Sequence, residues 1–152
     1  MSLQQWADNG WLRPHEPTRS EIADLLGIVD RDLRDAAGDI SADWRFGIAY
    51  NAALKLCTIL LHASGFRAEK ALQHYRTLAA LPGILGQEWR SDADYLEICR
   101  IKRNAAEYEM AGVATAQDAA ELIAFVKRLR VAVLDWLGSY HPELRPQART
   151  MQ

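Results

Sequence analysis

The sequence has few cysteines and almost no excess charge of either sign, and both scarcities exclude classes of protein. Its 152 residues carry 18 Lys and Arg against 20 Asp and Glu, a formal net charge of −2. A chain this close to neutral has no general attraction to DNA or to an anionic membrane, so nucleic-acid binding would need a local basic patch. The two cysteines, Cys57 and Cys99, lie among apolar residues of expected helices. We therefore expect buried, reduced thiols and not a structural disulfide.

Long apolar runs are missing as well. No stretch reaches the roughly 18 to 20 apolar residues that a membrane span needs. Residues 1–17 lack the basic-then-apolar order of a signal peptide. We expect a cytoplasmic protein that does not bind membranes. The length suits a single domain, with its core at about 18–138, an N-terminal arm at 1–17 and a C-terminal tail at 139–152 that frays.

The motifs of several familiar catalytic centres are absent. The four histidines, at 15, 62, 74 and 141, include no pair on adjacent turns of one helix and no HExxH motif, so no metal site is predicted. The chain also lacks a Gly-rich phosphate loop and a serine in a nucleophile-elbow context. We expect neither a metal nor a cofactor.

What the sequence does contain is a series of helix signals. They predict helices at about 18–37 with a capping box in "TRSE", 42–63 capped by Ser41, 67–80 closed by "LPG", 91–111 capped by "SDAD", and 115–138 capped by "TAQD". No segment alternates with a two-residue period, so no strand is predicted. Short connections between long amphipathic helices favour an all-α, up-and-down bundle of four main helices plus one shorter helix. The loop at 83–90 is the longest break.

The helix expected at 42–63 is apolar around most of its circumference, which indicates that it is buried on most sides. Its polar side chains form one narrow seam: Asn51, Lys55, Thr58 and His62. Two interpretations remain open. Lys55 can extend from the edge of the core to solvent, or the seam can line a cleft.

The stretch "RIKRNAAEYE" at 100–109 is the most unusual in the chain. Its helix has an expected apolar arc of Tyr95, Ile98, Cys99, Ile101, Ala105 and Ala106. Arg100, Arg103, Asn104 and Glu107 share the opposite face. Pairs four residues apart, Arg103 with Glu107 and Arg100 with Asn104, can account for this face as a solvated surface.

Two residues of the same helix do not fit that simple division. Tyr108 lies about 140° around the helix from Arg103, so the two side chains can cooperate only across a second helix or a second subunit. Lys102 projects into the expected apolar arc. A buried cation needs a partner, and the sequence does not identify one.

Two segments together resemble a known family. They are "AYNAALKLCTILLHASGF" at 49–66 and "RNAAEY" at 103–108, followed by a long closing helix. In this the chain resembles the HEPN domain (higher eukaryote and prokaryote nucleotide-binding) over about residues 18–138. The resemblance implies an all-α bundle, commonly a homodimer packed around the motif helix. Many members are metal-independent ribonucleases of toxin–antitoxin, defence or RNA-processing systems, and others bind nucleotides or pair with a small nucleotidyltransferase.

The match to the family's active motif is incomplete. That motif is Arg-x4–6-His, usually beginning Arg-Asn, and it maps onto Arg103 and Asn104, but the His position holds Tyr108. Tyrosine, with a pKa near ~10, is a poor base at neutral pH. Arg103 could still hold a phosphate group through two hydrogen bonds. The candidate catalytic residues are Arg103, Asn104 and Tyr108, and the candidate phosphate- or nucleotide-binding residues are Arg100, Arg103, Lys55, Asn51 and His62.

Three functions are compatible with these residues. The first is a weakly active or inactive HEPN-like homodimer that binds nucleotide, RNA or a partner protein such as an antitoxin or a nucleotidyltransferase, within a toxin–antitoxin or defence module. The second is an active metal-independent endoribonuclease that uses Arg103. The third is a helical interaction module without a ligand site.

Overall fold

The computed structural model describes residues 2–147, and most of them are helical. The four long helices are α2 (Arg19–Ala36), α3 (Ala42–Ala63), α6 (Arg90–Tyr108) and α7 (Ala116–Tyr140). The shorter elements are α1 (Leu3–Asp8), β1 (Leu12–Pro14), β2 (Phe66–Ala68), α4 (Gln73–Ala79), α5 (Leu81–Leu85) and the 3-10 helix η1 (Gln87–Trp89). The predicted helical class is confirmed in this broad sense.

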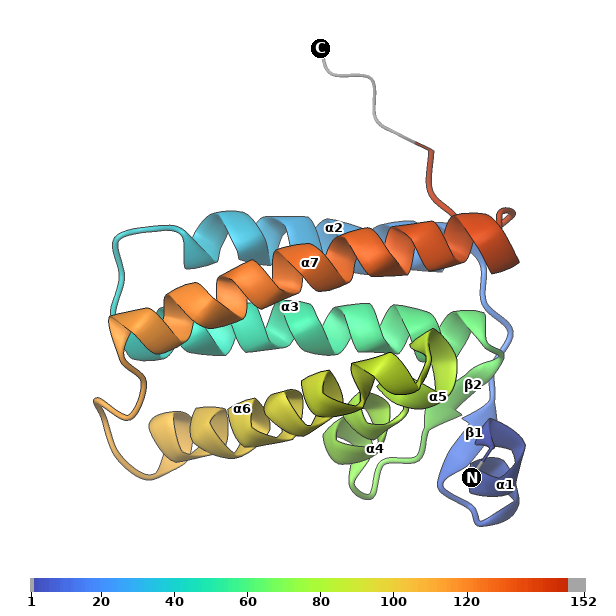
Figure 1. The fold of residues 1–152 in the computed structure, drawn as a ribbon, viewed down its shortest axis with the longest axis horizontal. Coiled ribbons are helices and arrows are strands. Elements are labelled where there is room, and N and C mark those ends of the chain that lie inside the picture. Colours follow the sequence, from blue (N-terminus) through green and yellow to red (C-terminus); the bar gives the residue numbers. More distant parts are fainter. Residues whose placement is uncertain (1, 148–152) are drawn as a thin grey trace.

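Helix α3 lies at the centre of the fold. It contacts α2, α6 and α7, and Figure 1 shows it between the α2 and α7 pair and the layer that contains α6. More residues are buried in α3 than in any other helix that the structure describes, as its nearly continuous apolar surface predicts. By length and composition alone α3 is apolar enough to cross a membrane, although the sequence was expected to contain no such segment. Within the protein, however, 67% of the 18-residue apolar stretch of α3 is buried. A core helix has these same properties.

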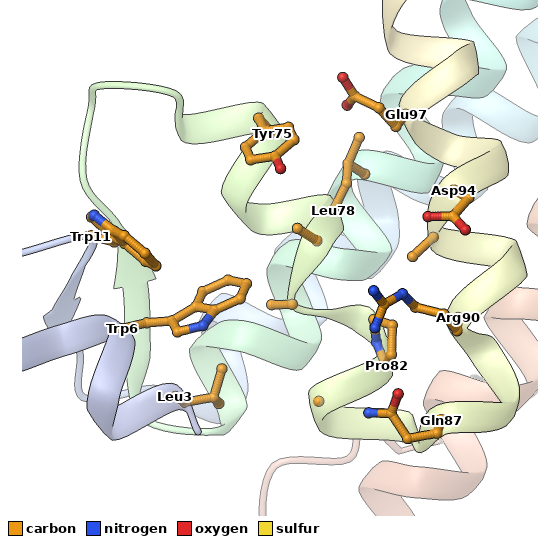
Figure 2. A pocket seen from close by; sticks show the side chains of 14 residues that line it. Leu3, Trp6, Trp11, Tyr75, Leu78, Pro82, Gln87, Arg90, Asp94 and Glu97 are labelled. Carbon is orange, nitrogen blue, oxygen red and sulfur yellow. The ribbon is translucent and has the colours of Figure 1, made fainter. Parts of the chain in front are cut away.

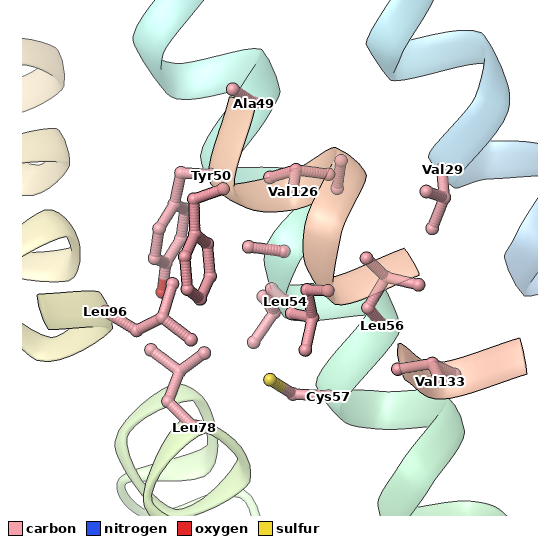
Figure 3. Close-up of a cluster of buried hydrophobic side chains, with 14 of the residues drawn as sticks. Val29, Ala49, Tyr50, Leu54, Leu56, Cys57, Leu78, Leu96, Val126 and Val133 are labelled. Atoms are coloured by element: carbon pink, nitrogen blue, oxygen red, sulfur yellow. The ribbon is translucent and has the colours of Figure 1, made fainter. Parts of the chain in front are cut away.

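The core includes both cysteines. Cys57 of α3 and Cys99 of α6 are free and buried, as predicted, and Figure 3 shows Cys57 among the apolar side chains of α3 and α7. Burial raises the pKa of the Cys57 thiol to about 12 and that of Cys99 to about 11. Neither thiol is therefore ionised at neutral pH.

Two helix caps match the sequence signals and two do not. Ser41 accepts a hydrogen bond from the Trp44 amide, and Thr115 forms a complete capping box with Asp118. Thr18 caps α2 through the Glu21 amide, but the Glu21 side chain points elsewhere. The "SDAD" segment does not cap α6, because η1 leads directly into that helix, which already begins at Arg90. No side chain caps the start of α6.

The helix expected at 67–80 and the absence of strands are both wrong. Phe66–Ala68 forms β2, which pairs antiparallel with β1. The helical part, α4, begins only at Gln73. Pro82 does not close it but occupies the first turn of α5, where proline is tolerated because that turn needs no amide donor. Strands of three residues are too short to show the alternation that predicts a strand.

The two ends of the chain are more ordered than expected. Leu12 of β1 is buried against Leu61 and Ala80, and Leu3 and Trp6 of α1 pack on the same cluster. The segment expected as an arm is thus part of the fold (Figure 1). In the expected tail, Leu144 is buried in the core. Residues 148–152 of that tail lie outside the described residues.

Candidate functional site

The inner face of α6 runs through Ala93, Leu96 and Cys99, which are buried. On a helical wheel Arg103 falls between Leu96 and Cys99, so it continues this inner face and does not lie on a free polar surface. Its guanidinium carbon lies 5.6 Å from the centroid of the Tyr50 ring of α3, and its side chain is only 25% exposed. The sequence-based orientation of α6 was wrong for Arg103.

The predicted orientation was also wrong for the outer face of α6. Ile98 and Ile101, expected in the core, are 60% and 57% exposed, and Tyr108 is 74% exposed. These three side chains fall within an arc of about 80°, roughly opposite to the inner face. Helix α6 therefore carries two apolar stripes, and the outer stripe, defined as Ile98, Ile101 and Tyr108, is uncovered. Tyr108 points away from the face on which Arg103 lies.

Arg100 and Arg103 have partners on their own helix. Arg103 contacts Glu107 at 2.8 Å, as predicted, and its Nη1 donates to Asn104 Oδ1 at 3.2 Å. The expected pair of Arg100 with Asn104 is wrong. Arg100 instead donates two hydrogen bonds to Glu97, at 2.8 and 2.7 Å. In this conformation each arginine is therefore offset by one nearby carboxylate.

Beneath Arg103, the hydroxyl of Tyr50 is buried and unpaired. The residue is 1% exposed, and its Oη is the one buried side-chain polar atom within residues 2–147 that has no hydrogen-bond partner. Burial raises the pKa of the Tyr50 phenol, while the charges of Arg103 and Arg100 oppose that rise. Figure 3 shows the hydroxyl end of Tyr50 turned toward Leu96 of α6. A buried donor without a partner costs about 1–3 kcal/mol, so this position is poorly explained by packing alone.

His74 of α4 belongs to the same cluster. Its ring centroid lies 6.3 Å from that of Tyr50. The pKa of His74 is lowered, first by partial burial of the ring and then by the positive charges of Arg103, Lys55 and Arg100. Arg100, Arg103 and His74, from α4 and α6, thus lie around Tyr50 of α3, and Lys55 of α3 lies close enough to His74 to lower its pKa. Sequence reasoning missed His74, because only the packing of α4 against α6 places it there.

The polar seam of α3 does not line one cleft. Asn51 donates to Asp32 of α2 at 2.7 Å, Thr58 bonds back to the Leu54 carbonyl at 2.8 Å, and His62 contacts Glu21 of α2 at 2.5 Å. Asn51 and His62, both predicted to bind phosphate, are therefore bonded to carboxylates of α2 in this structure. Of the seam, Lys55 is the residue whose charge acts on His74 together with Arg103 and Arg100.

Lys102 has the partner that the sequence could not identify. Its Nζ lies 3.1 Å from Asp118 Oδ2 and 6.0 Å from the centroid of the Phe46 ring. Asp118 also closes the capping box of α7. The pair therefore connects α6 to the first turn of α7. Lys102 thus contributes to the stability of the fold and not to the candidate site.

Two cavities flank this part of α6. One, of about 310 Å³, is lined by Trp44, Gly47, Arg103 and Glu107, among other residues. The other, of about 420 Å³, lies between the N-terminal segment and α4–α6; Figure 2 shows Trp6, Trp11 and Tyr75 on one side of it and Asp94 and Glu97 on the other. Arg103 thus has open space beside it into which a ligand can enter.

No known protein-family model matches the chain, and neither does any curated protein or any solved structure. The chemistry of the site is therefore read from its geometry. Two arginines and a histidine lie around a buried phenol, and Lys55 lies near the histidine. Such a set can bind phosphate oxygens through charge-assisted hydrogen bonds.

Proposed function

We propose that the protein is a HEPN-like helical homodimer in which the face formed by α3, α4 and α6 binds the phosphate groups of a nucleotide or of RNA. The observation that carries the proposal is the buried, unpaired hydroxyl of Tyr50 beneath Arg103. In this proposal α2, α3, α6 and α7 are the four main helices of an up-and-down bundle. A cytoplasmic location and an antitoxin or nucleotidyltransferase partner also remain predictions.

The binding step follows from the contacts in the cluster. A phosphate that approaches Arg103 competes with Glu107 for the guanidinium, and both carboxylate and phosphate fit its planar fork of donors. Lys55 forms no ion pair with any other residue in the part of the chain that the structure describes, so its charge is available to the ligand. A small movement of α4 or α6 would give the Tyr50 hydroxyl a phosphate oxygen to which it can donate.

The second candidate, a ribonuclease, has one supporting observation. Tyr108 is exposed on the outer side of α6 and cannot replace the missing motif histidine within one subunit. His74 is a neutral imidazole close enough to Arg103 for that charge to lower its pKa. A neutral imidazole can accept the proton of an RNA 2′-hydroxyl. In this candidate His74 is the base and Arg103 stabilises the charge on the phosphate.

Homodimer formation is supported by the outer stripe of α6. Large exposed apolar side chains grouped on one face are typical of interaction surfaces, and Ile98, Ile101 and Tyr108 share such a face. In the proposed dimer, each subunit covers the outer stripe of its partner. If the site binds no phosphate, the same stripe supports the third candidate, an interaction module.

The test is a titration of the protein with labelled single-stranded RNA and with ATP at two salt concentrations. Arg103→Ala should weaken binding by about 1.5–3 kcal/mol, the value of a charge-assisted hydrogen bond, and should reduce the dependence of affinity on salt. Lys55→Ala should weaken binding as well. Arg34→Ala and Lys127→Ala remove exposed cations elsewhere and serve as controls. If the wild-type protein binds neither ligand at physiological salt, the phosphate-binding proposal is wrong.

RNA cleavage separates the first two candidates. A protein that binds RNA and cleaves it in the presence of a chelator, and that loses cleavage but keeps binding in His74→Gln, supports the ribonuclease. Binding without cleavage supports the inactive HEPN-like protein.

A further inference from the structure

A cluster of two histidines and one glutamate lies away from the candidate phosphate site. His15 follows β1, Glu21 is in the first turn of α2, and His62 is in the last turn of α3. His15 Nε2 lies 2.8 and 2.9 Å from the two carboxylate oxygens of Glu21, and His62 Nδ1 lies 2.5 Å from one of them. The three ligand atoms all lie within 4.8 Å of one another.

The backbone holds these side chains in place before any ligand arrives. The His15 amide donates to the Gly65 carbonyl at 2.9 Å, in the turn that joins α3 to β2. Thr18 caps the helix on which Glu21 lies. The two imidazole rings lie with their centroids 4.1 Å apart and their planes tilted by 36°. The cluster therefore joins three segments of the chain with little freedom to rearrange.

The three side chains are mostly buried but can still be reached from solvent. Those of His15, Glu21 and His62 are 20%, 27% and 19% exposed. A carboxylate oxygen and an unprotonated imidazole nitrogen are both metal ligands. An ion that enters from solvent therefore meets three groups that can coordinate it.

We propose that His15, Glu21 and His62 form a binding site for a divalent first-row transition metal ion. Two imidazoles and one carboxylate are a donor set typical of Zn²⁺ sites that keep a fourth position open, and the same set binds Fe²⁺. Ligand atoms sit about 2.0–2.2 Å from such an ion. The three groups need only move slightly apart to admit it.

The step that admits the metal conserves protons. In the metal-free cluster, His15 donates from Nε2 and His62 from Nδ1 to the shared carboxylate. On binding, the proton on the nitrogen of each ring that faces Glu21 must leave it, either to the other nitrogen of a ring that carries one proton or to water from a ring that carries two. The freed nitrogen then coordinates the ion. Glu21 then exchanges two hydrogen bonds for one metal bond. The ion would fasten residues 2–16 to α2 and α3, and this site is separate from the proposed phosphate site.

The direct test uses tag-free protein freed of metal with a chelator. Calorimetric titration with Zn²⁺ should show one equivalent bound per chain, and Co²⁺ should give the visible absorption of a four- or five-coordinate ion. Removing an outer-shell partner of a metal ligand costs about 10- to 100-fold in affinity, so loss of a ligand in Glu21→Gln or His62→Ala should cost at least that much. His141→Ala removes a surface histidine that contacts Glu143 and should leave the affinity unchanged.

Hydrogen exchange gives a second measurement, independent of calorimetry. Bound Zn²⁺ should slow the exchange of the backbone amides of residues 11–13 and of His15 in the wild-type protein and should not do so in Glu21→Gln. Absence of stoichiometric Zn²⁺ and Co²⁺ binding would overturn the proposal and leave the cluster as a hydrogen-bonded connection. Binding that survives Glu21→Gln and His62→Ala but is lost in His141→Ala would overturn it too.

Discussion

Tyr50 joins two properties that normally exclude each other, full burial and an unpaired hydroxyl. The Tyr50→Phe variant keeps the ring and removes the hydroxyl. Because an unpaired buried group costs about 1–3 kcal/mol, we expect the ligand-free variant to be more stable by a similar amount in urea denaturation. We expect the same variant to bind RNA or nucleotide more weakly, because the hydroxyl can no longer donate to the ligand.

Tyr140→Phe is the matched control, because Tyr140 is 70% exposed and its hydroxyl reaches water. It should change neither stability nor binding. A loss of stability in Tyr50→Phe would mean that the hydroxyl already has a partner, such as an ordered water molecule, and would remove the main support for the proposed site.

His74 reports the positive charge of the cluster directly. NMR titration should give it a pKa below the ordinary value of about 6.5, because partial burial and the charges of Arg103, Lys55 and Arg100 all disfavour the imidazolium. Arg103→Ala should raise this pKa, and Lys127→Ala should not change it. An unshifted pKa in Arg103→Ala would show that Arg103 is too distant to act with His74.

The same pKa has a consequence for stability. The unfolded chain, in which His74 has its ordinary pKa, takes up a proton at higher pH than the folded chain does. The contribution of His74 is therefore fully present above about pH 6.5, and it is lost as the pH falls from that value through the lower pKa of the folded state. His74→Gln should reduce the fall in the free energy of unfolding between neutral and mildly acidic pH.

At the scale of helices, α3 supplies more of the core than any other helix that the structure describes. Leu60 is fully buried in it, so Leu60→Ala should lower the free energy of unfolding by about 2–5 kcal/mol, the usual range for a buried leucine. Leu72→Ala makes the same chemical change at a leucine that is 61% exposed and should have little effect. Urea denaturation of both variants checks the prediction. A loss below about 1 kcal/mol in Leu60→Ala would contradict the central position of α3.

The two helices that carry the phosphate site differ in how well the sequence predicts them. Helix α3 is apolar nearly all round, so any orientation buries it, and the prediction of burial did not depend on its neighbours. Helix α6 has two apolar stripes, and periodicity alone cannot decide which stripe faces the core. The expected apolar arc contained Ile98 and Ile101 together with Cys99, whereas the structure buries Cys99 together with Ala93 and Leu96. This rotation of the buried face moved Arg103 from the expected surface to Tyr50.

The His15, Glu21 and His62 cluster shows a different limit of the sequence. Metal-ligand motifs are recognised when ligands are close in sequence, and these three come from three separate segments. The capping-box motif at 18–21 predicted that the Glu21 carboxylate would bond to the start of α2 and not to the histidines. Pairing of β1 with β2 is what brings His15 to the end of α3. Strands of three residues leave no sequence pattern from which that pairing could be predicted.

For the whole molecule, the outer stripe of α6 determines whether one chain is the functional unit. The inner face of α6 holds Arg103 toward Tyr50, and the outer stripe leaves Ile98, Ile101 and Tyr108 to solvent in the single chain. Covering this stripe with a second copy would remove apolar surface from water. It would also bury Tyr108, which is 74% exposed in the single chain, against the partner.

We therefore expect light scattering to give the mass of a dimer at tens of micromolar. Ile101→Asp should shift the protein to a monomer, because a carboxylate in the centre of an apolar interface loses its hydration without a partner. Val131→Asp is the matched control: Val131 of α7 is 59% exposed, and this variant should remain a dimer. Circular dichroism should show that both variants are folded. A wild-type monomer, or a dimer that persists in Ile101→Asp and dissociates in Val131→Asp, would contradict an interface on α6 and would require the phosphate site to be complete within one chain.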